Sequence, residues 1–250
     1  MTLNAMVKES PRRLSKQLAE CVPAEWPAPD HVHAFTTIRK GGASEGNYDS
    51  FNLALHVDDQ PSAVISNRQL LKDIFELPAE PVWLQQNHSN CVIAADHFDH
   101  VAADAAWASS KNTVCAVLTA DCLPVFFTNK AGSRVAIAHA GWRGLLNGVI
   151  SATFSAMKIE VDDCLVWLGP SIGPDVFEVG GEVLQLFTDK NKATLASFRQ
   201  KDEKHWWCDM VQLARVELNQ LGIGQVFGGD LCTYTDKENF YSFRRDGNTG

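Results

Sequence analysis

The sequence lacks a long apolar run of any kind. No stretch of it reaches the ~18 consecutive apolar residues that a membrane-spanning helix requires. Its first residues, M-T-L-N-A-M-V-K-E-S-P-R-R, also lack the apolar core of a secretory signal peptide. These two absences argue against a membrane-spanning or exported protein, and we expect the chain to act in the cytoplasm.

An excess of positive charge is also absent. Lys and Arg together number 22 and Asp and Glu number 30, so the formal net charge is -8 and the isoelectric point lies near 5.4. Proteins that bind nucleic acids usually carry a basic surface, because they must neutralise phosphates. We therefore expect neither nucleic acid nor a membrane as the partner of this chain.

The cysteines do not form the even, regularly spaced set of a disulfide framework. There are seven of them, dispersed along the chain and mostly placed in apolar runs such as V-C-A-V-L. In a reducing compartment such cysteines are small buried side chains, so disulfides are not expected. Cys122 differs, because A-D-C-L-P places an acid before it and a proline two residues after it.

The overall composition is that of an ordinary globular protein. Of the 250 residues, 45% are hydrophobic and 21% are charged, which suits one large domain. Residues 1–28 are polar, contain several prolines and show no clear periodicity, apart from a short helix expected around Leu14–Cys21. We therefore predict a loosely attached N-terminal arm over 1–28, followed by a single domain over 29–250.

Apolar periodicity predicts more strands than helices. Helical spacing occurs over residues 62–75, 142–157 and 210–221, and a short helix is expected near Gly181. Short apolar runs between turn residues predict strands at 31–39, 81–84, 91–94, 113–118, 125–128, 134–138, 165–168 and 225–227. Because the strands come in clusters and do not alternate strictly with helices, we predict an α+β fold with a mixed or antiparallel sheet.

Three residues far apart in the chain have the chemistry of metal ligands. His88 lies in the polar turn Q-Q-N-H-S-N, Cys122 in L-T-A-D-C-L-P-V and His139 in A-H-A-G-W-R-G, and the last two each follow a predicted strand. Two imidazoles and a thiolate suit zinc, and three protein ligands leave a fourth tetrahedral position open. The pattern therefore favours a catalytic zinc site, although a single His or Cys is more often a structural residue.

Another group of residues, A-D-H-F-D-H, has a superficial likeness to a metal cluster. It contains Asp96, His97, Asp99 and His100, but it is short and polar, precedes V-A-A-D-A-A and has no soft ligand nearby. We interpret it as a surface loop. The remaining histidines, including His56, have no motif around them, and we interpret them as structural.

Several polar residues are candidates for binding a substrate. Arg244 and Arg245 lie in F-Y-S-F-R-R-D-G-N-T-G, and Arg39 and Arg143 are further cations; such groups bind phosphate or another anion. A surface cluster of ion pairs would explain Arg244 and Arg245 equally well. Asn52, in S-F-N-L-A-L-H, is another candidate, for which capping a turn is the alternative.

These motifs together resemble one protein family. The stretches that carry the resemblance are T-T-I-R-K-G-G-A-S-E-G-N-Y, Q-Q-N-H, L-T-A-D-C-L-P-V, A-H-A-G-W-R-G, L-G-P-S-I-G-P and F-Y-S-F-R-R-D-G-N-T-G, in order from about residue 35 to the end. They resemble the YfiH-like or laccase-domain family, also called polyphenol oxidoreductases, whose members include peptidoglycan editing factors and purine nucleoside phosphorylases. Departures from its pattern are the Ser89 that follows His88, and Ser171 and Asp175, which stand where cysteines are often found.

The resemblance has implications for the fold, the metal and the reaction. It implies an α+β layered sandwich of mixed or antiparallel sheets flanked by helices, with zinc bound by His88, Cys122 and His139. Activities assigned to members are the phosphorolysis of adenosine, inosine or methylthioadenosine with adenosine deamination, the hydrolysis of an amide in a peptidoglycan precursor, and copper-dependent phenol oxidation. The expected partner is therefore a small molecule, either a nucleoside with phosphate or a cell-wall precursor.

Four functions follow as hypotheses, and we rank a zinc-dependent purine nucleoside phosphorylase first. The second is an amidase in which Cys122 is the nucleophile and His139 or His88 the base. The third is a copper oxidase, which eight histidines do not favour. The fourth is a binding module with structural zinc. In the enzyme hypotheses Asp121 is the candidate for proton transfer or for orienting a ligand.

Overall fold

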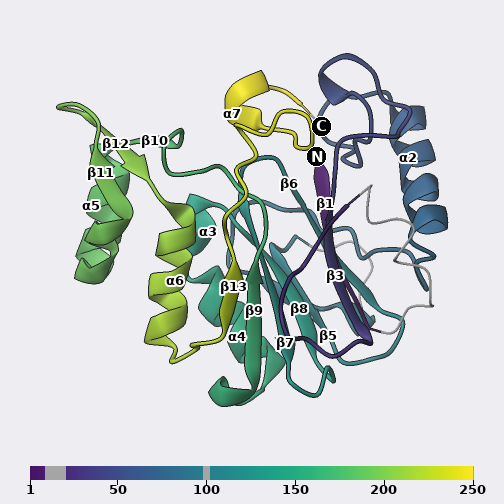
Figure 1. Ribbon diagram of the computed structural model, residues 1–250, viewed down its shortest axis with the longest axis horizontal. Coiled ribbons are helices and arrows are strands. Elements are labelled where there is room, and N and C mark those ends of the chain that lie inside the picture. Colours follow the sequence, from purple (N-terminus) through teal and green to yellow (C-terminus); the bar gives the residue numbers. More distant parts are fainter. Residues whose placement is uncertain (9–20, 98–101, 250) are drawn as a thin grey trace.

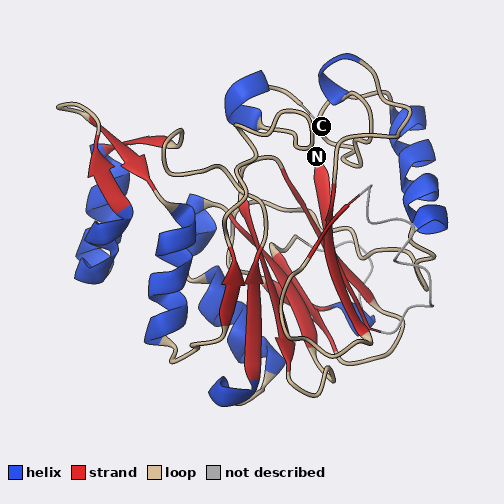
Figure 2. Ribbon diagram, viewed as in Figure 1, coloured by secondary structure: helices blue, strands red, loops and turns tan. Residues whose placement is uncertain are grey.

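Two β-sheets pack face to face between layers of helices (Figure 1, Figure 2). The computed structural model describes residues 1–8, 21–97 and 102–249. Most of the helix expected around Leu14–Cys21, together with Asp99 and His100, lies outside these residues. Within them, no helix has the length and apolar character needed to cross a membrane.

The first sheet has four antiparallel strands in the order β2-β3-β1-β6. Its strands are β1 (Thr2–Lys8), β2 (Cys21–Pro23), β3 (Val32–Thr37) and β6 (Val114–Thr119). The outer face of this sheet is covered by α2 (Pro61–Ile74), where Leu3, Ala5 and Phe35 meet Leu71. Gln60 precedes the proline that begins α2, and this proline suits the first turn because that position needs no hydrogen-bonded N–H.

The predicted N-terminal arm is wrong for Thr2–Lys8, which form the inner strand β1 between β3 and β6, and for Cys21–Pro23, which form the edge strand β2. Leu3, Ala5 and Val7 point to the α2 side, and Met6 points to the other sheet. Asn4 is buried too, and its amide bonds to Thr36 and Thr119 on the neighbouring strands. The alternation is hard to recognise in the sequence because both faces of this strand are buried and a polar Asn interrupts it.

The second sheet has six strands in the order β13-β9-β7-β8-β5-β4. They are β4 (Val92–Ala94), β5 (Ala105–Ala108), β7 (Leu123–Asn129), β8 (Val135–Ala140), β9 (Cys164–Leu168) and β13 (Val226–Gly228). The pairs β4–β5 and β9–β13 are parallel and the others are antiparallel, so the sheet is mixed. The strand predicted at 81–84 is reduced to a single bridge between Val82 and Cys115.

Three helices cover the outer face of the six-stranded sheet: α3 (Trp142–Asn147), α4 (Val149–Met157) and α6 (Met210–Gln220). The sequence predicts one helix over 142–157, but Gly148 adopts a left-handed φ of 81° and divides it into α3 and α4. Asp209 caps α6 as expected, since its carboxylate accepts a hydrogen bond from the Gln212 amide.

A smaller unit lies at one side of the sandwich, at the left of Figure 1. It consists of β10 (Glu178–Gly180), α5 (Gly181–Lys190), β11 (Phe198–Gln200) and β12 (His205–Cys208). The helix α7 (Phe243–Asp246) lies near the two chain ends, which are close together in Figure 1. Short 3-10 helices at Gly46–Tyr48, Ala95–His97, Val161–Asp163 and Lys192–Ser197 complete the architecture.

The buried apolar residues form three clusters that correspond to the layers. One fills the space between the two sheets, one lies between the four-stranded sheet and α2, and one lies between the six-stranded sheet and the helices α3 to α6. The predicted α+β layered sandwich, with mixed and antiparallel sheets flanked by helices, is confirmed.

Candidate metal centre and substrate cavity

The structure brings His88, Cys122 and His139 together. The sulfur of Cys122 and one ring nitrogen of each histidine all lie within 4.8 Å of one another. Cys122 Sγ is 3.7 Å from His88 Nε2, and the two imidazole rings meet edge to face with centroids 4.8 Å apart. In the described part of the chain this is the group of three such residues that could hold a metal ion.

The pairing of β7 with β8 explains why Cys122 and His139 meet. Pro124 is opposite His139 and Leu123 is opposite Ala140, so Cys122, which directly precedes β7, lies at the same end of this pair. We expected His139 directly after its strand, but it lies within β8, near the end of that strand, and is only 4% exposed. His88 comes from a separate loop, in which it adopts a left-handed φ of 62°.

Asp104, which we did not expect from the sequence as a site residue, connects this loop to His139. Its buried carboxylate is 2.8 Å from His139 Nδ1 and accepts hydrogen bonds from the backbone N–H groups of His88 and Ser89. The bond to Nδ1 leaves Nε2 of His139 as the nitrogen that faces the cluster. A signal was present in V-A-A-D-A-A, where one acid interrupts an apolar run.

The charged forms of Cys122 and His139 stabilise each other. Burial alone would raise the pKa of the Cys122 thiol, but the positive charge and hydrogen bond of His139 and the hydrogen bond from His88 lower it to about 6. Burial would lower the pKa of His139, yet the Cys122 thiolate and the bond to Asp104 raise it. Without a metal, the cluster therefore favours a thiolate beside an imidazolium.

The residues of the cluster fit a zinc ion. Zinc bonds of about 2.0 to 2.3 Å place tetrahedral donors roughly 3.5 Å apart, and the separation of Cys122 Sγ and His88 Nε2 is close to this. Gly141 lies against the same atoms, because a Cβ added there would be 2.7 Å from the His88 ring and 2.9 Å from Cys122 Sγ. A residue without a side chain is therefore required to keep this space open.

The cluster lies in the wall of a cavity of about 510 Å³, a size typical of small-molecule sites. Aromatic and apolar side chains form much of the cavity, including Trp142, Phe177, Met210 and the 64% exposed Phe243. His56, which we interpreted from sequence as structural, also lines this cavity. A flat apolar molecule with polar edges would match such a lining.

Asp121 lines the cavity, but its carboxylate holds the C-terminal segment. It accepts hydrogen bonds from the hydroxyls of Thr233 and Ser242 and from the backbone N–H of Arg244. The residue has a φ of 95°, which turns the chain between β6 and β7. Its position beside the metal cluster thus serves to bring Arg244 to the cavity.

The four predicted arginines divide into two groups. Arg143 and Arg244 line the cavity; the Arg143 guanidinium lies 4.4 Å from the ring of Trp142, and that of Arg244 donates to the backbone oxygen of Glu178. Arg245 instead donates to backbone oxygens of Thr233 and Phe240 and pairs with Asp246, so it fastens the C-terminal segment.

Arg39 and Asn52 likewise lie outside the lining of this cavity. Arg39 donates to the Asp49 backbone oxygen and stacks 4.6 Å from the ring of Tyr241. Asn52 is fully buried; its amide nitrogen bonds to Asp59, and its oxygen accepts a hydrogen bond from the Ala54 amide. The turn-capping alternative therefore describes Asn52 better than substrate contact does.

The competing motif A-D-H-F-D-H forms no metal group within the described residues. Asp96 accepts hydrogen bonds from Ser109, Ser110 and Thr113, which holds a loop together. His97 is exposed. The interpretation as a surface loop fits these two residues.

The chain is similar over most of its length to several known proteins. The chain is 46% identical to the purine nucleoside phosphorylase YfiH of Escherichia coli (strain K12), over 93% of this chain and 96% of that protein. It is 44% identical to the purine nucleoside phosphorylase PA4543 of Pseudomonas aeruginosa, over 90% and 93%. The crystal structure of Neisseria meningitidis protein NMB0706 matches with a TM-score of 0.89 and 41% identity, over 92% of this chain and 96% of that chain.

A second structure and a family match agree with these relatives. The Bacillus licheniformis protein YfiH matches with a TM-score of 0.81 and 28% identity, over 87% of this chain and 89% of that chain. The family described as multi-copper polyphenol oxidoreductase laccase matches residues 32–250. Because this match and the relatives span most of the chain, the protein belongs to that laccase-like family, the one that its sequence motifs resemble.

Proposed function

We propose that this chain is a cytoplasmic, zinc-dependent purine nucleoside phosphorylase that also deaminates adenosine. The observation that carries the proposal is the His88–Cys122–His139 cluster in the wall of a cavity that also contains Arg143 and Arg244. The names of the relatives in E. coli and P. aeruginosa support the same reaction class. Adenosine, inosine and methylthioadenosine are the proposed substrates.

Zinc held by His88, Cys122 and His139 would act as a Lewis acid toward an oxygen of the reacting groups. Two imidazoles and a thiolate are also suitable donors for copper. A multicopper oxidase, however, needs several coppers to reduce dioxygen by four electrons, and the described residues provide one group of this kind. We therefore place zinc first and copper second.

The cavity provides separate surfaces for the two substrates. Trp142, Phe177 and Phe243 offer aromatic faces on which a purine can stack. Arg143 is exposed at the cavity and has no carboxylate partner within the described residues, so its charge is available for phosphate. Phosphorolysis breaks the bond between C1′ and the base and forms a bond from C1′ to a phosphate oxygen, so the two sites must be adjacent.

Two carboxylates keep this arrangement in place. Asp104 fixes the ring of His139 and the loop of His88 at once. Asp121 holds the backbone of Arg244, so that the arginine reaches the cavity from the C-terminal segment. Preorganised groups of this kind lower the barrier because they need not rearrange during the reaction.

The test is an assay of the purified, zinc-loaded protein with inosine and phosphate. We expect hypoxanthine and ribose 1-phosphate, and from adenosine without phosphate we expect inosine and ammonia. The Cys122→Ser variant should lose both activities and its bound zinc, whereas Cys91→Ser, which changes an exposed cysteine outside the cluster, should keep them. Absence of base release by the zinc-loaded wild-type protein would refute the proposal.

A Cys/His amidase remains the second candidate because of one observation. Cys122, His139 and Asp104 form the series of thiolate, imidazole and carboxylate that cysteine hydrolases use. In that mechanism the metal-free protein would be the active form, and an amide of a cell-wall precursor would acylate Cys122. Mass spectrometry that finds an acyl group on Cys122 in metal-free protein would favour the amidase over the phosphorylase.

A further inference from the structure

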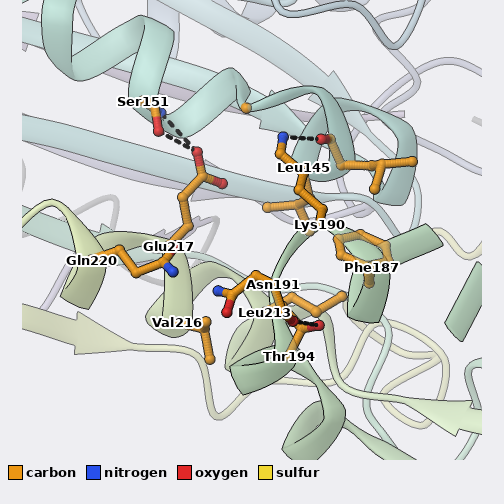
Figure 3. Close-up of a pocket in the computed structure, with 12 residues that line it drawn as sticks. Leu145, Ser151, Phe187, Lys190, Asn191, Thr194, Leu213, Val216, Glu217 and Gln220 are labelled. Carbon is orange, nitrogen blue, oxygen red and sulfur yellow. Dashed lines mark hydrogen bonds between the residues drawn. The ribbon is translucent and has the colours of Figure 1, made fainter. Parts of the chain in front are cut away.

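A second cavity borders the end of α3 that carries Leu145 and Leu146 (Figure 3). It has a volume of about 180 Å³ and shares no lining residue with the cavity of the metal centre. Its walls come from α3, α4, α5 and α6 and from the 3-10 helix at Lys192–Ser197. Gly148, which separates α3 from α4, also lines this cavity.

Two side chains of opposite charge hold the two sides of this break (Figure 3). The ammonium group of Lys190, on α5, donates to the Leu146 backbone oxygen near the end of α3. The carboxylate of Glu217, on α6, accepts hydrogen bonds from the amide and hydroxyl of Ser151 near the start of α4. Each charge is favourable there, since a helix is negative at its C-terminus and positive at its N-terminus.

Lys190 and Glu217 face the same cavity but form no ion pair with each other in the described structure. Both bonds to Ser151 use Oε1 of Glu217, so Oε2 can accept a further hydrogen bond. The ammonium of Lys190 likewise has donors beyond the one that bonds to Leu146. Burial raises the pKa of Glu217, and the hydrogen bonds from Ser151 and the charge of Lys190 offset only part of this effect.

The rest of the lining is partly apolar. Leu145, Phe187, Leu213 and Val216 contribute side chains to the walls, and the amide of Asn191 is a further polar group. The volume is roughly six times the ~30 Å³ that one water molecule occupies in the liquid. This space suits a small molecule.

We propose that this cavity binds a small zwitterion of the α-amino-acid class with a short apolar side chain. The ligand's ammonium group would bond to Glu217, its carboxylate to Lys190, and its side chain would contact the apolar wall. Two opposite charges that separate hydrogen bonds hold apart match a ligand with the reverse arrangement of charges.

Binding there would act on the metal-centre cavity through α3. This helix has only six residues, and it carries Trp142 and Arg143 in one cavity and Leu145 and Leu146 in the other. A ligand that draws Lys190 away from Leu146 would therefore shift the end of α3 and with it the Arg143 guanidinium. This consequence rests on the proposed function, and it predicts a change in the KM for phosphate with little change in kcat.

The binding experiment uses L-valine as the probe, with isobutylamine and isobutyrate as analogues that each keep one charge. Calorimetry and thermal unfolding of the zinc-loaded wild-type protein should show saturable binding of valine, with at least about tenfold weaker binding of either analogue. Equal binding of the three compounds, or no binding of valine, would overturn the proposal. This result does not depend on any enzymatic activity.

Variants locate the site. Glu217→Gln keeps an oxygen that can accept from Ser151 and removes the charge, and Lys190→Met removes the ammonium; each should weaken valine binding about tenfold or more. Lys192→Met is the matched control, because Lys192 is exposed and does not line the cavity. Unchanged binding in Glu217→Gln, in a protein that unfolds like the wild type, would refute the assignment.

The kinetic experiment measures phosphorolysis at increasing phosphate, with and without saturating valine. We expect valine to change the KM for phosphate severalfold in the wild type and not in Glu217→Gln. If valine binds but leaves this KM unchanged, the coupling through α3 is wrong. If no phosphorolysis occurs at all, the proposed function fails while the binding result still decides the site.

Discussion

The metal centre and the two arginines of the same cavity are held in different ways. We call these arginines, Arg143 and Arg244, the arginine wall. Cys122 and His139 lie at one end of the β7–β8 pair, where His139 is buried and Cys122 is half-buried. Arg143 and Arg244 extend from α3 and α7, which are helices of six and four residues at the surface. Two of the three donors are thus fixed by a sheet, whereas the cations are held by short segments with a few hydrogen bonds.

This difference suggests a division of labour. A metal site tolerates little displacement, because donor geometry determines affinity. A phosphate site must admit and release its ligand, and exposed arginines on short helices allow such movement. Changes at the metal centre should therefore remove metal and activity together, whereas changes at the arginine wall should alter substrate affinity and leave the metal in place.

Among the variants that test this difference between the metal centre and the arginine wall, Asp104→Asn should have the largest effect. The amide cannot provide the negative charge that orients His139, and its NH₂ group can face backbone N–H groups that now bond to a carboxylate. Zinc affinity, measured by competition with a chelator, should fall about 10- to 100-fold. The free energy of unfolding should also fall, by about 1–3 kcal/mol.

Asp96→Asn is the matched control for this change. Asp96 also accepts several hydrogen bonds from loop residues, among them Ser109 and Thr113, but it does so away from the metal centre. The control should lose stability and keep its zinc affinity. Equal loss of zinc affinity in both variants would show that Asp104 acts only through general stability.

An intermediate effect is expected for Arg143→Met. Removing a charged hydrogen-bond donor to phosphate should raise the KM for phosphate about tenfold, with unchanged zinc content, and Arg143→Lys should restore part of the loss. Steady-state kinetics with varied phosphate and metal analysis of the same samples provide the measurement. Arg199→Met is the control, since Arg199 pairs with Asp175 at the surface. Loss of zinc from Arg143→Met would contradict the expected difference between the metal centre and the arginine wall.

The smallest effect concerns pH and tests the metal-free centre. The pKa of Cys122 is lowered to about 6, so its thiolate should be largely present at pH 7 and decrease about tenfold per pH unit well below pH 6. Alkylation of Cys122 by iodoacetamide, followed by mass spectrometry, should therefore have its midpoint near pH 6, and zinc should prevent it. Replacing His139 by Asn should move the midpoint to higher pH. A midpoint near that of a free cysteine would contradict the thiolate–imidazolium pair.

The sequence indicated the donors of the centre because their chemistry is distinctive. Cys122 directly precedes β7 and His139 lies near the end of β8, and the pairing of these two strands brings them together. The strand pattern and the capping residue Asp209 also led to the correct fold class and to α6. In these places the local signal and the tertiary structure agree.

Other features, namely β1, the contacts of Asp104 and the different roles of Arg244 and Arg245, could not be predicted from local patterns. Long-range contacts determine them. β1 is a strand only because β3 and β6 pair with both of its edges. The bonds of Asp104 to His139 and the His88 loop depend on a chain reversal that no periodicity shows. Likewise, nothing in R-R distinguishes Arg244, which reaches the cavity, from Arg245, which fastens backbone oxygens.

The place of β1 has a consequence for the synthesis of the protein. Asn4 donates to the backbone oxygen of Val117, 113 positions later in the chain. In a nascent polypeptide β3 can pair with one edge of this strand early, but the other edge stays unpaired until β6 has left the ribosome. Closing so long a loop is entropically costly and slow, and exposed strand edges invite aggregation meanwhile. During translation the β6-facing edge of β1 is thus exposed over the synthesis of more than a hundred residues.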